Sequence, residues 1–436
     1  MDYSGKIISR FAPTPTGTFQ LGIIRNALYV FLLTKKTKGK FILRVDDTDP
    51  RSKKKNEKYI IDSLIWLGLN PDEIYRQSER KHIYRRYIEK LIKNGSAYIT
   101  NKDEDKKTLI RFKNCGGKVK YFDQIRGEIV SDVSYFGDFV IARSMNDPTY
   151  HLASVVDDYE MGINYVLRGE DHIPNTPKHI MIATALGIKP PKYCHLPLLL
   201  GPDRTKLSLR KEQGMNILDF KKAGYLPEAI LNFVALSGWS PKKNMRPIFS
   251  KKELLRFFSI KGLQKANAIF DITKLDWFNK QHIRKMSLVE KFKISKSFLP
   301  KKYKTKNCVF LKKLLVFLFN RINNFSDINK MTKEGQIKYF FERPKCHFEE
   351  EINISDIKTL VTILKEIPDK NFEKTFIYSK LKDLNKSNSI IHPLEQMRRI
   401  LSGRLISFDP VSISSIIGKK ETLYRLNNCI KKYVVL

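Results

Sequence analysis

Hydrophobic and polar positions follow two different periods in the first part of the chain, and each period predicts its own kind of element. Residues 6–11 alternate and then run apolar, and residues 40–45 are also typical of a buried strand. Between them, apolar residues recur at helical spacing over 22–36. After the second strand, residues 56–67 form a further amphipathic stretch with one apolar face. The order strand, loop, helix, strand predicts the unit from which nucleotide-binding, doubly wound parallel sheets are built.

The rest of the chain divides by pattern into an irregular stretch, a second α/β stretch and a long helical one. Residues from about 95 to 145 are less regular and rich in Lys, Asp and Gly, so we expect an inserted or connecting subdomain there. Strands are predicted at 165–168 and 193–200, separated by a helix at 176–186. Beyond Pro227 helical periodicities continue to the C-terminus, and they predict a separate, lysine-rich helical domain in the last third.

Charge changes this picture because basic residues greatly outnumber acidic ones. The 436 residues include 81 Lys+Arg and 45 Asp+Glu, which gives a formal net charge of +36. Self-repulsion of this size is relieved on a polyanion, so nucleic acid is the partner class that the composition indicates first. The alternative is a compositional drift that simply coats the surface with lysine.

Composition also argues against several classes of protein. No uncharged apolar run reaches the roughly 18 residues of a membrane span, so we expect no membrane association. The five cysteines lie far apart without metal-ligand spacing, which favours reduced thiols and no structural zinc. The first motif begins soon after Met1 and leaves no space for a cleavable leader, so a cytoplasmic location is expected.

Two loops that follow the first predicted strands have residue types suited to ligand binding. Residues 12–17 read Ala-Pro-Thr-Pro-Thr-Gly, and a helix begins near Gly22. Unpaired N–H groups at a helix N-terminus suit a nucleotide triphosphate. After the second strand come Asp46, Asp47 and Asp49, at the sheet edge where a carboxylate can hold an amine or a hydroxyl. The alternatives are an ordinary proline-rich loop and a solvated acidic turn.

Two later segments add further candidates. Arg168 is a candidate clamp for a substrate carboxylate, because a guanidinium fork matches that geometry. Glu170 and Asp171 can accept hydrogen bonds from a ribose or an amine, and His172 is as readily a satisfied loop histidine as a ligand contact. Residues 201–211 form a basic loop of the kind that closes over phosphates, with a cationic surface turn as the alternative.

Taken together, in this order and spacing, these four segments resemble those of the class I glutamyl-tRNA synthetases. The Pro-x-Pro-Thr-Gly loop at 13–17 is similar to that family, whereas glutaminyl enzymes carry Glu and Asn in the loop. Residues 224–240 and 270–277 look like the family's helical stem-contact region, and 393–403 and 418–423 look like the end of its anticodon-binding domain. The resemblance covers essentially the whole chain. This argues against the short glutamyl-queuosine type of relative, which lacks an anticodon domain.

The resemblance implies an α/β fold with a Rossmann-like doubly wound parallel sheet and an inserted acceptor-binding subdomain, followed by helical stem-contact and all-α anticodon-binding domains. The expected division is a first half of the catalytic domain at 1–79, an inserted tRNA acceptor-binding subdomain at 80–145, a second half of the catalytic domain with the basic ATP loop at 146–215, a helical stem-contact domain at 216–308 and an all-α anticodon-binding domain at 309–436.

It also implies an activity in translation. Glutamate and ATP, with Mg²⁺, would form glutamyl-adenylate and pyrophosphate, and the 3′ end of tRNA(Glu) would then take the glutamyl group, with a monomer as the expected state. By position, the residues expected to hold glutamate are Arg10, Ala12, Thr14, Asp46, Tyr150, Ser154 and Arg168, with Arg10 and Arg168 as partners of the side-chain carboxylate. The residues expected to hold ATP are Gln20, Leu21, Gly22, Asp171, Lys206, Leu207, Ser208, Leu209 and Arg210, with Gln20, Lys206 and Arg210 as the catalytic ones.

Four residues depart from the family's pattern. Gln20 stands at the first histidine of the His-Ile-Gly signature and has no charge to offer a phosphate, and Leu209 stands at the second lysine of the Lys-Leu-Ser-Lys-Arg loop. Asp46 stands where a glutamate is usual, and Ser154 where an asparagine is usual. Two alternatives to an active glutamyl enzyme therefore stay open: a decayed synthetase that binds tRNA without charging it, and a glutaminyl-tRNA synthetase.

Overall fold

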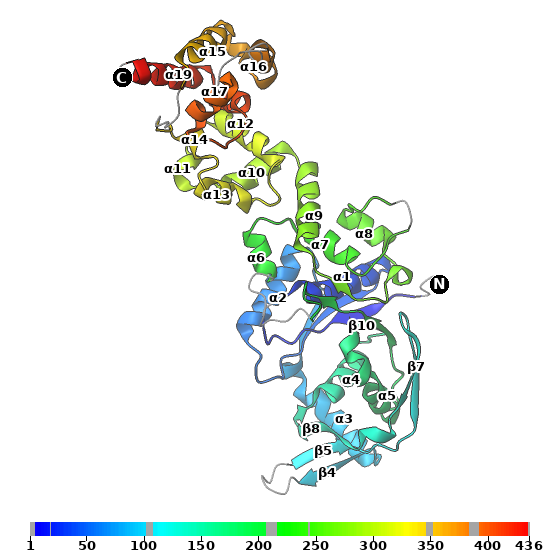
Figure 1. The fold of residues 1–436 in the computed structure, drawn as a ribbon. Helices are drawn as coiled ribbons and strands as arrows, with labels where there is room; N and C mark the ends of the chain where they lie inside the picture. The colour runs from blue at the N-terminus through cyan, green and yellow to red at the C-terminus, as the bar shows by residue number, and fades with distance from the viewer. Residues whose placement is uncertain are drawn as a thin grey trace. The chain divides into compact units, whose positions relative to one another are not determined.

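The computed structural model describes residues 5–17, 19–101, 108–205, 216–242, 245–345, 352–382 and 392–434 (Figure 1). The chain forms two compact units, which meet in sequence between His282 and Ile283, within helix α9 (Ile272–Lys285). The finer division into five domains stays a prediction. None of the helices in the described ranges is long and apolar enough to cross a membrane.

The N-terminal unit opens with the predicted strand, helix, strand unit. Strands β1 (Ile8–Phe11), β2 (Lys40–Val45) and β3 (Glu73–Arg76) form a parallel sheet, connected by helices α1 (Leu21–Lys36) and α2 (Lys54–Trp66). This confirms the α/β class and the parallel sheet. The carboxyl ends of β1 and β2 lie at the same edge, so the residues that follow them are brought together.

Helix α1 lies in the hydrophobic core of this unit. It is apolar on nearly every side, and Leu28, Val30 and Leu32 are fully buried. Such a helix needs partners on several faces, and α1 packs on β1 and β2 as well as on helices α7 (Pro227–Leu236) and α8 (Lys251–Phe257). The turn after it requires Gly39, because a Cβ there would lie 1.8 Å from the carbonyl oxygen of Ile7.

A second set of parallel strands carries the other half of the site. Strands β10 (Tyr165–Gly169) and β11 (Lys192–Leu196) pair in parallel, with helix α5 (Thr176–Ala185) between them in sequence and α4 (Tyr150–Glu160) before them. β10 runs beside β1, and the amide of Asn164 donates to the carbonyl of Ile8 at 3.1 Å. The strand predicted at 165–168 and the helix predicted at 176–186 are confirmed. The strand predicted at 193–200 is instead two strands: β11 ends at Leu196, and Leu199–Leu200 pairs in a different sheet with Ala268–Ile269.

The stretch from 95 to 145, expected to be irregular, is a region of β-strands. Strands β4 (Ala97–Asn101), β5 (Thr108–Phe112), β8 (Phe139–Ser144) and β9 (Asp147–Pro148) form an antiparallel sheet. Strands β6 (Lys118–Asp123) and β7 (Gly127–Asp132) form a hairpin, and β6 pairs with β11 through Tyr193 and Asp123. Exposed and half-buried residues alternate along the hairpin, so no apolar run marks it in the sequence.

The remaining elements are mostly helical, as predicted beyond Pro227. The N-terminal unit also contains α3 (Lys81–Lys93), α6 (Ile217–Lys222), β12 (Leu199–Leu200) and β13 (Ala268–Ile269). The C-terminal unit contains α10 (Leu288–Phe298), α11 (Lys301–Lys304), α12 (Cys308–Phe319), α13 (Ser326–Lys333), α14 (Lys338–Phe341), α15 (Ile354–Glu366), α16 (Lys374–Leu381), α17 (Pro393–Ser402), α18 (Pro410–Ile417) and α19 (Lys419–Val434). Its described residues form no strand.

Candidate active site

A cavity of about 580 Å³ lies at the carboxyl ends of the parallel strands, where ligands of open α/β sheets bind. Its walls come from the end of β1 and the following loop, the start of α1, the end of β2, the start of α4, the end of β10 and the residues before β12. The lining residues are Arg10, Phe11, Ala12, Pro13, Thr14, Gln20, Gly22, Ile23, Arg25, Asn26, Arg44, Asp46, Tyr150, Leu167, Arg168, Gly169, Asp171, His172, Pro197, Leu198 and Leu199.

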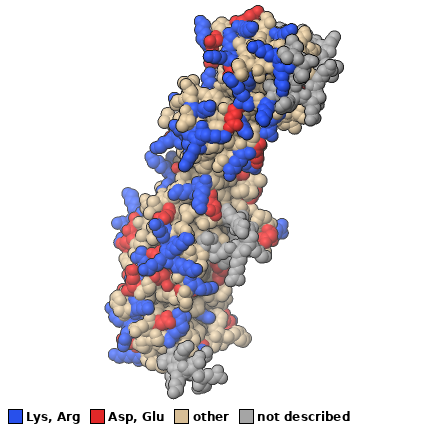
Figure 2. Space-filling view, turned by 90° about the vertical axis from the view of Figure 1, so that its left-hand side faces the viewer, with Lys and Arg blue, Asp and Glu red and all other residues tan. Residues whose placement is uncertain are grey.

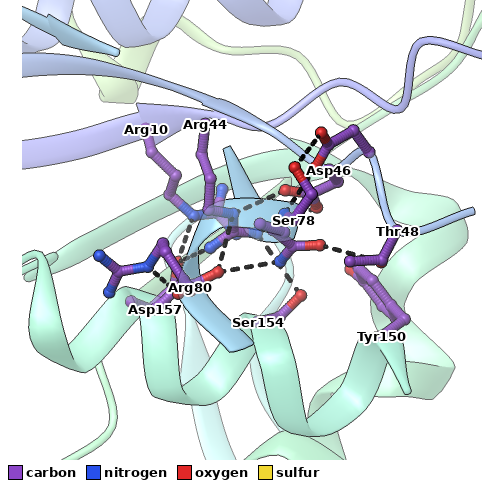
Figure 3. A network of polar contacts seen from close by, with 12 residues as sticks. Arg10, Arg44, Asp46, Thr48, Ser78, Arg80, Tyr150, Ser154 and Asp157 are labelled. Carbon is purple, nitrogen blue, oxygen red and sulfur yellow. Dashed lines mark hydrogen bonds and ion pairs between the residues drawn. The ribbon is translucent and has the colours of Figure 1, made fainter. Parts of the chain in front are cut away.

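Arg44, on β2, is the centre of a buried charge network (Figure 3). Its Nε and Nη2 donate to the two carboxylate oxygens of Asp46, at 2.7 and 3.1 Å, and its Nη1 donates to Asp158 Oδ1 at 2.8 Å. The carboxylate of Asp157 lies 3.8 Å from Arg44 Nε and accepts from Arg80 Nε at 2.7 Å. Burial lowers the pKa of the Arg44 guanidinium, but the aspartates outweigh that effect and raise the pKa well above its usual value.

Arg10 joins this network from the neighbouring strand. Its Nε donates to Asp158 Oδ1 at 2.8 Å, the same oxygen that accepts from Arg44. Burial raises the pKa of the Asp158 carboxyl, but Arg10 and Arg44 outweigh burial, so the pKa is lowered. At Asp46 burial outweighs Arg44, and the pKa is raised. Arg10 therefore reaches the cavity with a carboxylate already bound to it.

Arg168, on β10, is bonded in a different way. Its Nε donates to His195 Nε2 at 3.2 Å and its Nη2 to Thr176 Oγ1 at 2.7 Å. Its Nη1 lies 3.5 Å from Tyr150 Oη and 3.3 Å from His179 Nδ1. The side chain is buried, and no carboxylate among the described residues lies within ion-pair distance of it. Arg168 thus keeps a buried positive charge in a setting of neutral acceptors.

The histidines beside Arg168 are held neutral. Burial, together with the charge of Arg168, lowers the pKa of His172 to about 4 and that of His179 well below its usual value. Burial, with Lys178 and Arg168 adding to it, lowers the pKa of His151 to about 4. At pH 7 none of these rings adds a second cation to this wall of the cavity.

The N-terminus of α1 opens into the same cavity. Gln20 is the N-cap residue, with extended backbone, and its carbonyl accepts from the amides of Ile23 and Ile24, both at 3.1 Å. The side chain of Gln20 does not cap the helix. A Cβ on Gly22 would meet only Leu199, at an ordinary 3.7 Å, so protein packing does not require the glycine. Its absent side chain leaves the first turn accessible from the cavity.

The structure brings most of the predicted site residues to this one cavity. Two of them lie behind its wall: Leu21 is buried in the core, and Ser154 is buried with its Oγ 3.5 Å from Arg44 Nη2. The basic loop of 206–210 lies outside the described residues. The predicted residues that line the cavity are Arg10, Ala12, Thr14, Gln20, Gly22, Asp46, Tyr150, Arg168 and Asp171.

Sequence reasoning missed the residues that hold these side chains in place. Arg44 and Asp158 received no role from the sequence, although Arg44 lies near the end of the strand predicted at 40–45, where a charged residue in an apolar run is a usable signal. Arg25 lines the cavity and donates to the carbonyls of Pro197 and Ser237, which no local pattern indicates. Among the residues that the structure describes, no group of three or more His, Cys, Asp or Glu is arranged to hold a metal ion.

Basic side chains are prominent on the surface. On the face drawn in Figure 2, Lys and Arg are more frequent than Asp and Glu over both units. This distribution agrees with the net charge of +36 and provides positive potential outside the cavity as well.

Comparison with known proteins gives the family. The family described as the catalytic domain of tRNA synthetases class I (E and Q) matches residues 6–106 and 99–277, and an anticodon binding domain family matches 285–430. The chain is 36% identical to the glutamate–tRNA ligase of Hydrogenobaculum sp. (strain Y04AAS1), over 96% of this chain and 99% of that protein. It is 40% identical to the glutamate–tRNA ligase of Aquifex aeolicus, over 74% of this chain and 77% of that protein.

A solved structure agrees with these relatives. The crystal structure of a glutamate tRNA ligase from Elizabethkingia meningosepticum, in complex with its amino acid, matches with a TM-score of 0.87 at 28% identity, over 98% of this chain and 99% of that chain. The resemblance inferred from the motifs is thereby confirmed. This chain belongs to the class I tRNA synthetases for glutamate and glutamine, in which its relatives are glutamate–tRNA ligases.

Proposed function

We propose that this protein is a glutamate–tRNA ligase: it activates glutamate with ATP to glutamyl-adenylate and transfers the glutamyl group to the 3′ end of tRNA(Glu). The observation that carries the proposal is the buried guanidinium of Arg168, which has neutral acceptors around it and lines the same cavity as the N-terminus of α1. The Arg168 guanidinium fits an amino acid with a second carboxylate, and the N-terminus of α1 fits a nucleotide triphosphate.

In this proposal the glutamate side-chain carboxylate binds between Arg168 and Arg10, with the Tyr150 hydroxyl beside it. Glutamine binds less well, because its amide would leave the buried guanidinium without a charged partner. The rest of the predicted glutamate site is formed by Ala12, Thr14, Asp46 and Ser154, with Ser154 acting through Arg44.

ATP enters as its magnesium complex, as a substrate. Its phosphates are proposed to lie at the first turn of α1, where N–H groups and the helix dipole favour negative charge. Gln20 donates a hydrogen bond there, and Gly22 leaves the approach open. Asp171 and the loop residues Lys206, Ser208 and Arg210 complete the predicted ATP site. The basic surface supports tRNA as the partner, and a monomer in the cytosol remains the expectation.

A tRNA-binding protein without charging activity is the second candidate, because Gln20 and Leu209 replace a histidine and a lysine of the family's pattern. Loss of one transition-state donor typically costs about 10² to 10³ in rate. Such a loss slows a synthetase without changing its substrate.

One experiment separates these candidates. Purified tRNA(Glu) and tRNA(Gln) are each incubated with the protein, ATP and either glutamate or glutamine, and ATP–pyrophosphate exchange is measured with and without tRNA. The proposal expects charging of tRNA(Glu) with glutamate. Preference for glutamine would instead establish a glutaminyl enzyme, and tRNA binding without exchange or charging would establish the binding-only protein.

A further inference from the structure

We propose that Asp123 and His195 are positioning residues for the amino-acid site: through one fixed tautomer of the His195 ring they orient Arg168 while leaving its charge available to the substrate. The proposal rests on the proposed function, because it takes Arg168 as the partner of the substrate carboxylate. It assigns a role in this site to the hairpin of β6 and β7, which contributes no residue to the cavity wall.

The first step is the tautomer. His195 Nδ1 lies 2.8 Å from Asp123 Oδ2, and His195 Nε2 lies 3.2 Å from the Nε of Arg168. A carboxylate only accepts and a guanidinium only donates. Nδ1 must therefore hold the proton and Nε2 must be the bare acceptor.

The second step is that the ring stays neutral. Burial lowers the pKa of His195; the bond to Asp123 raises it, but that effect is smaller than the effect of burial, and Arg168 lowers the pKa further. A protonated ring would point an N–H at the N–H of Arg168 and repel it. The side chains of His195 and Asp123 are both fully buried, so no solvent competes for these bonds.

The third step is that Asp123 is itself fixed by the hairpin turn. Its Oδ1 accepts from the amides of Ile125 and Arg126, at 2.9 and 2.8 Å, and its Oδ2 also accepts from the amide of His195, at 2.9 Å. Burial raises the pKa of Asp123, but His195 and the two turn amides outweigh burial and lower it. The carboxylate is thus ionised and anchored to three backbone groups.

The consequence concerns the charge of Arg168. A carboxylate placed directly on this guanidinium would orient it equally well but would also occupy it, as Asp158 occupies Arg10. The His195 ring lies between Asp123 and Arg168. Asp123 fixes the ring, the ring orients Arg168 Nε, and the charge of the Asp123 carboxylate stays one imidazole ring away from the guanidinium. The charge of Arg168, which no carboxylate of the described residues neutralises, then meets the substrate in a fixed geometry.

Two substitutions of the same residue separate positioning from a merely structural role. H195Q places its amide at the Nε2 position, where the side-chain oxygen still accepts from Arg168, and it loses the bond to Asp123. H195N places its amide at the Nδ1 position, where it still donates to Asp123, and it loses the acceptor for Arg168. Glutamate and ATP are varied separately in ATP–pyrophosphate exchange, in the presence of tRNA.

We expect H195N to raise the KM for glutamate about tenfold and to leave the KM for ATP within about twofold, with H195Q closer to wild type, since only H195N loses the hydrogen bond that Arg168 donates. The opposite order, with H195N like wild type and H195Q impaired for both substrates, would mean that the Asp123–His195 pair only anchors the hairpin, and the proposal would be overturned.

A second measurement needs no activity and reads the wild-type ring directly. The ¹⁵N chemical shifts of the His195 ring in the full-length wild-type protein, assigned by their absence in H195Q, should show a protonated Nδ1 and a bare Nε2 at pH 7. A protonated Nε2, or a doubly protonated ring, overturns the proposal. Absence of glutamate-dependent exchange and charging by the wild type would instead refute the proposed function, while the ring shifts would still decide the tautomer.

Discussion

Two walls of one cavity hold buried arginines in opposite ways. Arg44 is 1% exposed and bonds to the carboxylates of Asp46 and Asp158, whereas Arg168 is 6% exposed and bonds to a hydroxyl and to neutral histidines. Burying an unpaired ion costs roughly several kcal/mol of folding free energy, so the pairing of Arg44 with the aspartates stabilises the folded protein. The missing pair at Arg168 leaves a charge whose cost is offset when a carboxylate binds.

The two walls share a boundary at Arg10. This side chain belongs to the paired wall through Asp158, yet it lines the cavity together with Arg168. A substrate carboxylate between the two arginines therefore meets one guanidinium that is partly neutralised and one that is not. We infer that Arg168 contributes more than Arg10 to the preference for a carboxylate over an amide.

The largest effect is expected on the paired wall. R44M removes the cation that Asp46 and Asp158 share and leaves two buried carboxylates short of a partner. Breaking a buried pair in this way costs about 3–5 kcal/mol. The free energy of unfolding is measured in urea by tryptophan fluorescence, which reports the N-terminal unit alone because Trp66, Trp239 and Trp277 all precede its end at His282.

The matched control is R85M. Arg85 pairs with Glu89 on α3 at 2.9 Å, but both side chains are 53% exposed, so a change below about 1 kcal/mol is expected. Equal losses for R44M and R85M would contradict the structural role of the paired wall.

The next effect is expected on the unpaired wall, in binding instead of stability. R168A removes charge-assisted hydrogen bonds worth about 1.5–3 kcal/mol, so the KM for glutamate should rise roughly ten- to hundredfold. The KM for ATP should change little, and the unfolding free energy should not fall as it does in R44M, because no carboxylate loses its partner. Equal effects on glutamate and ATP would refute Arg168 as the carboxylate clamp.

A smaller effect is expected from pH. His151 and His172 have a pKa of about 4 in the folded protein and 6.5 as the usual value, so between these limits the unfolded chain binds protons that the folded one does not. Stability is therefore present above pH 6.5 and is lost as the pH falls towards 4. From pH 7 to pH 5.5 each histidine should remove about 1 kcal/mol, measured by the same urea titrations.

The R168A variant sharpens this prediction. The charge of Arg168 is the second cause, after burial, of the low pKa of His172. In R168A the pKa of His172, followed by NMR, should rise towards its usual value. An unchanged His172 pKa would mean that the charge of Arg168 is already neutralised in the protein, and the contrast between the two walls would disappear.

Local sequence was sufficient for much of the fold and for the family. Strand β2 lies at the predicted 40–45, α1 begins within a residue of Gly22, and the motifs alone led to the correct family. These features depend on short-range periodicity and on turn chemistry, which a single sequence displays. The hairpin of β6 and β7 was missed because it lacks such a signal: exposed and half-buried residues alternate along it, with Lys, Asp and Gly among them, and no apolar run marks it.

What only the tertiary structure decided is which charges are paired. Arg10 and Asp158 are 148 positions apart, and Asp123 and His195 are 72 apart, so no periodicity connects them. The sequence by itself determined the parallel strands, the helix that opens the cavity, and the residue types that chemistry requires at the strand ends. The parallel order of those strands then brought distant side chains to one edge, and burial there made each pairing, or its absence, consequential.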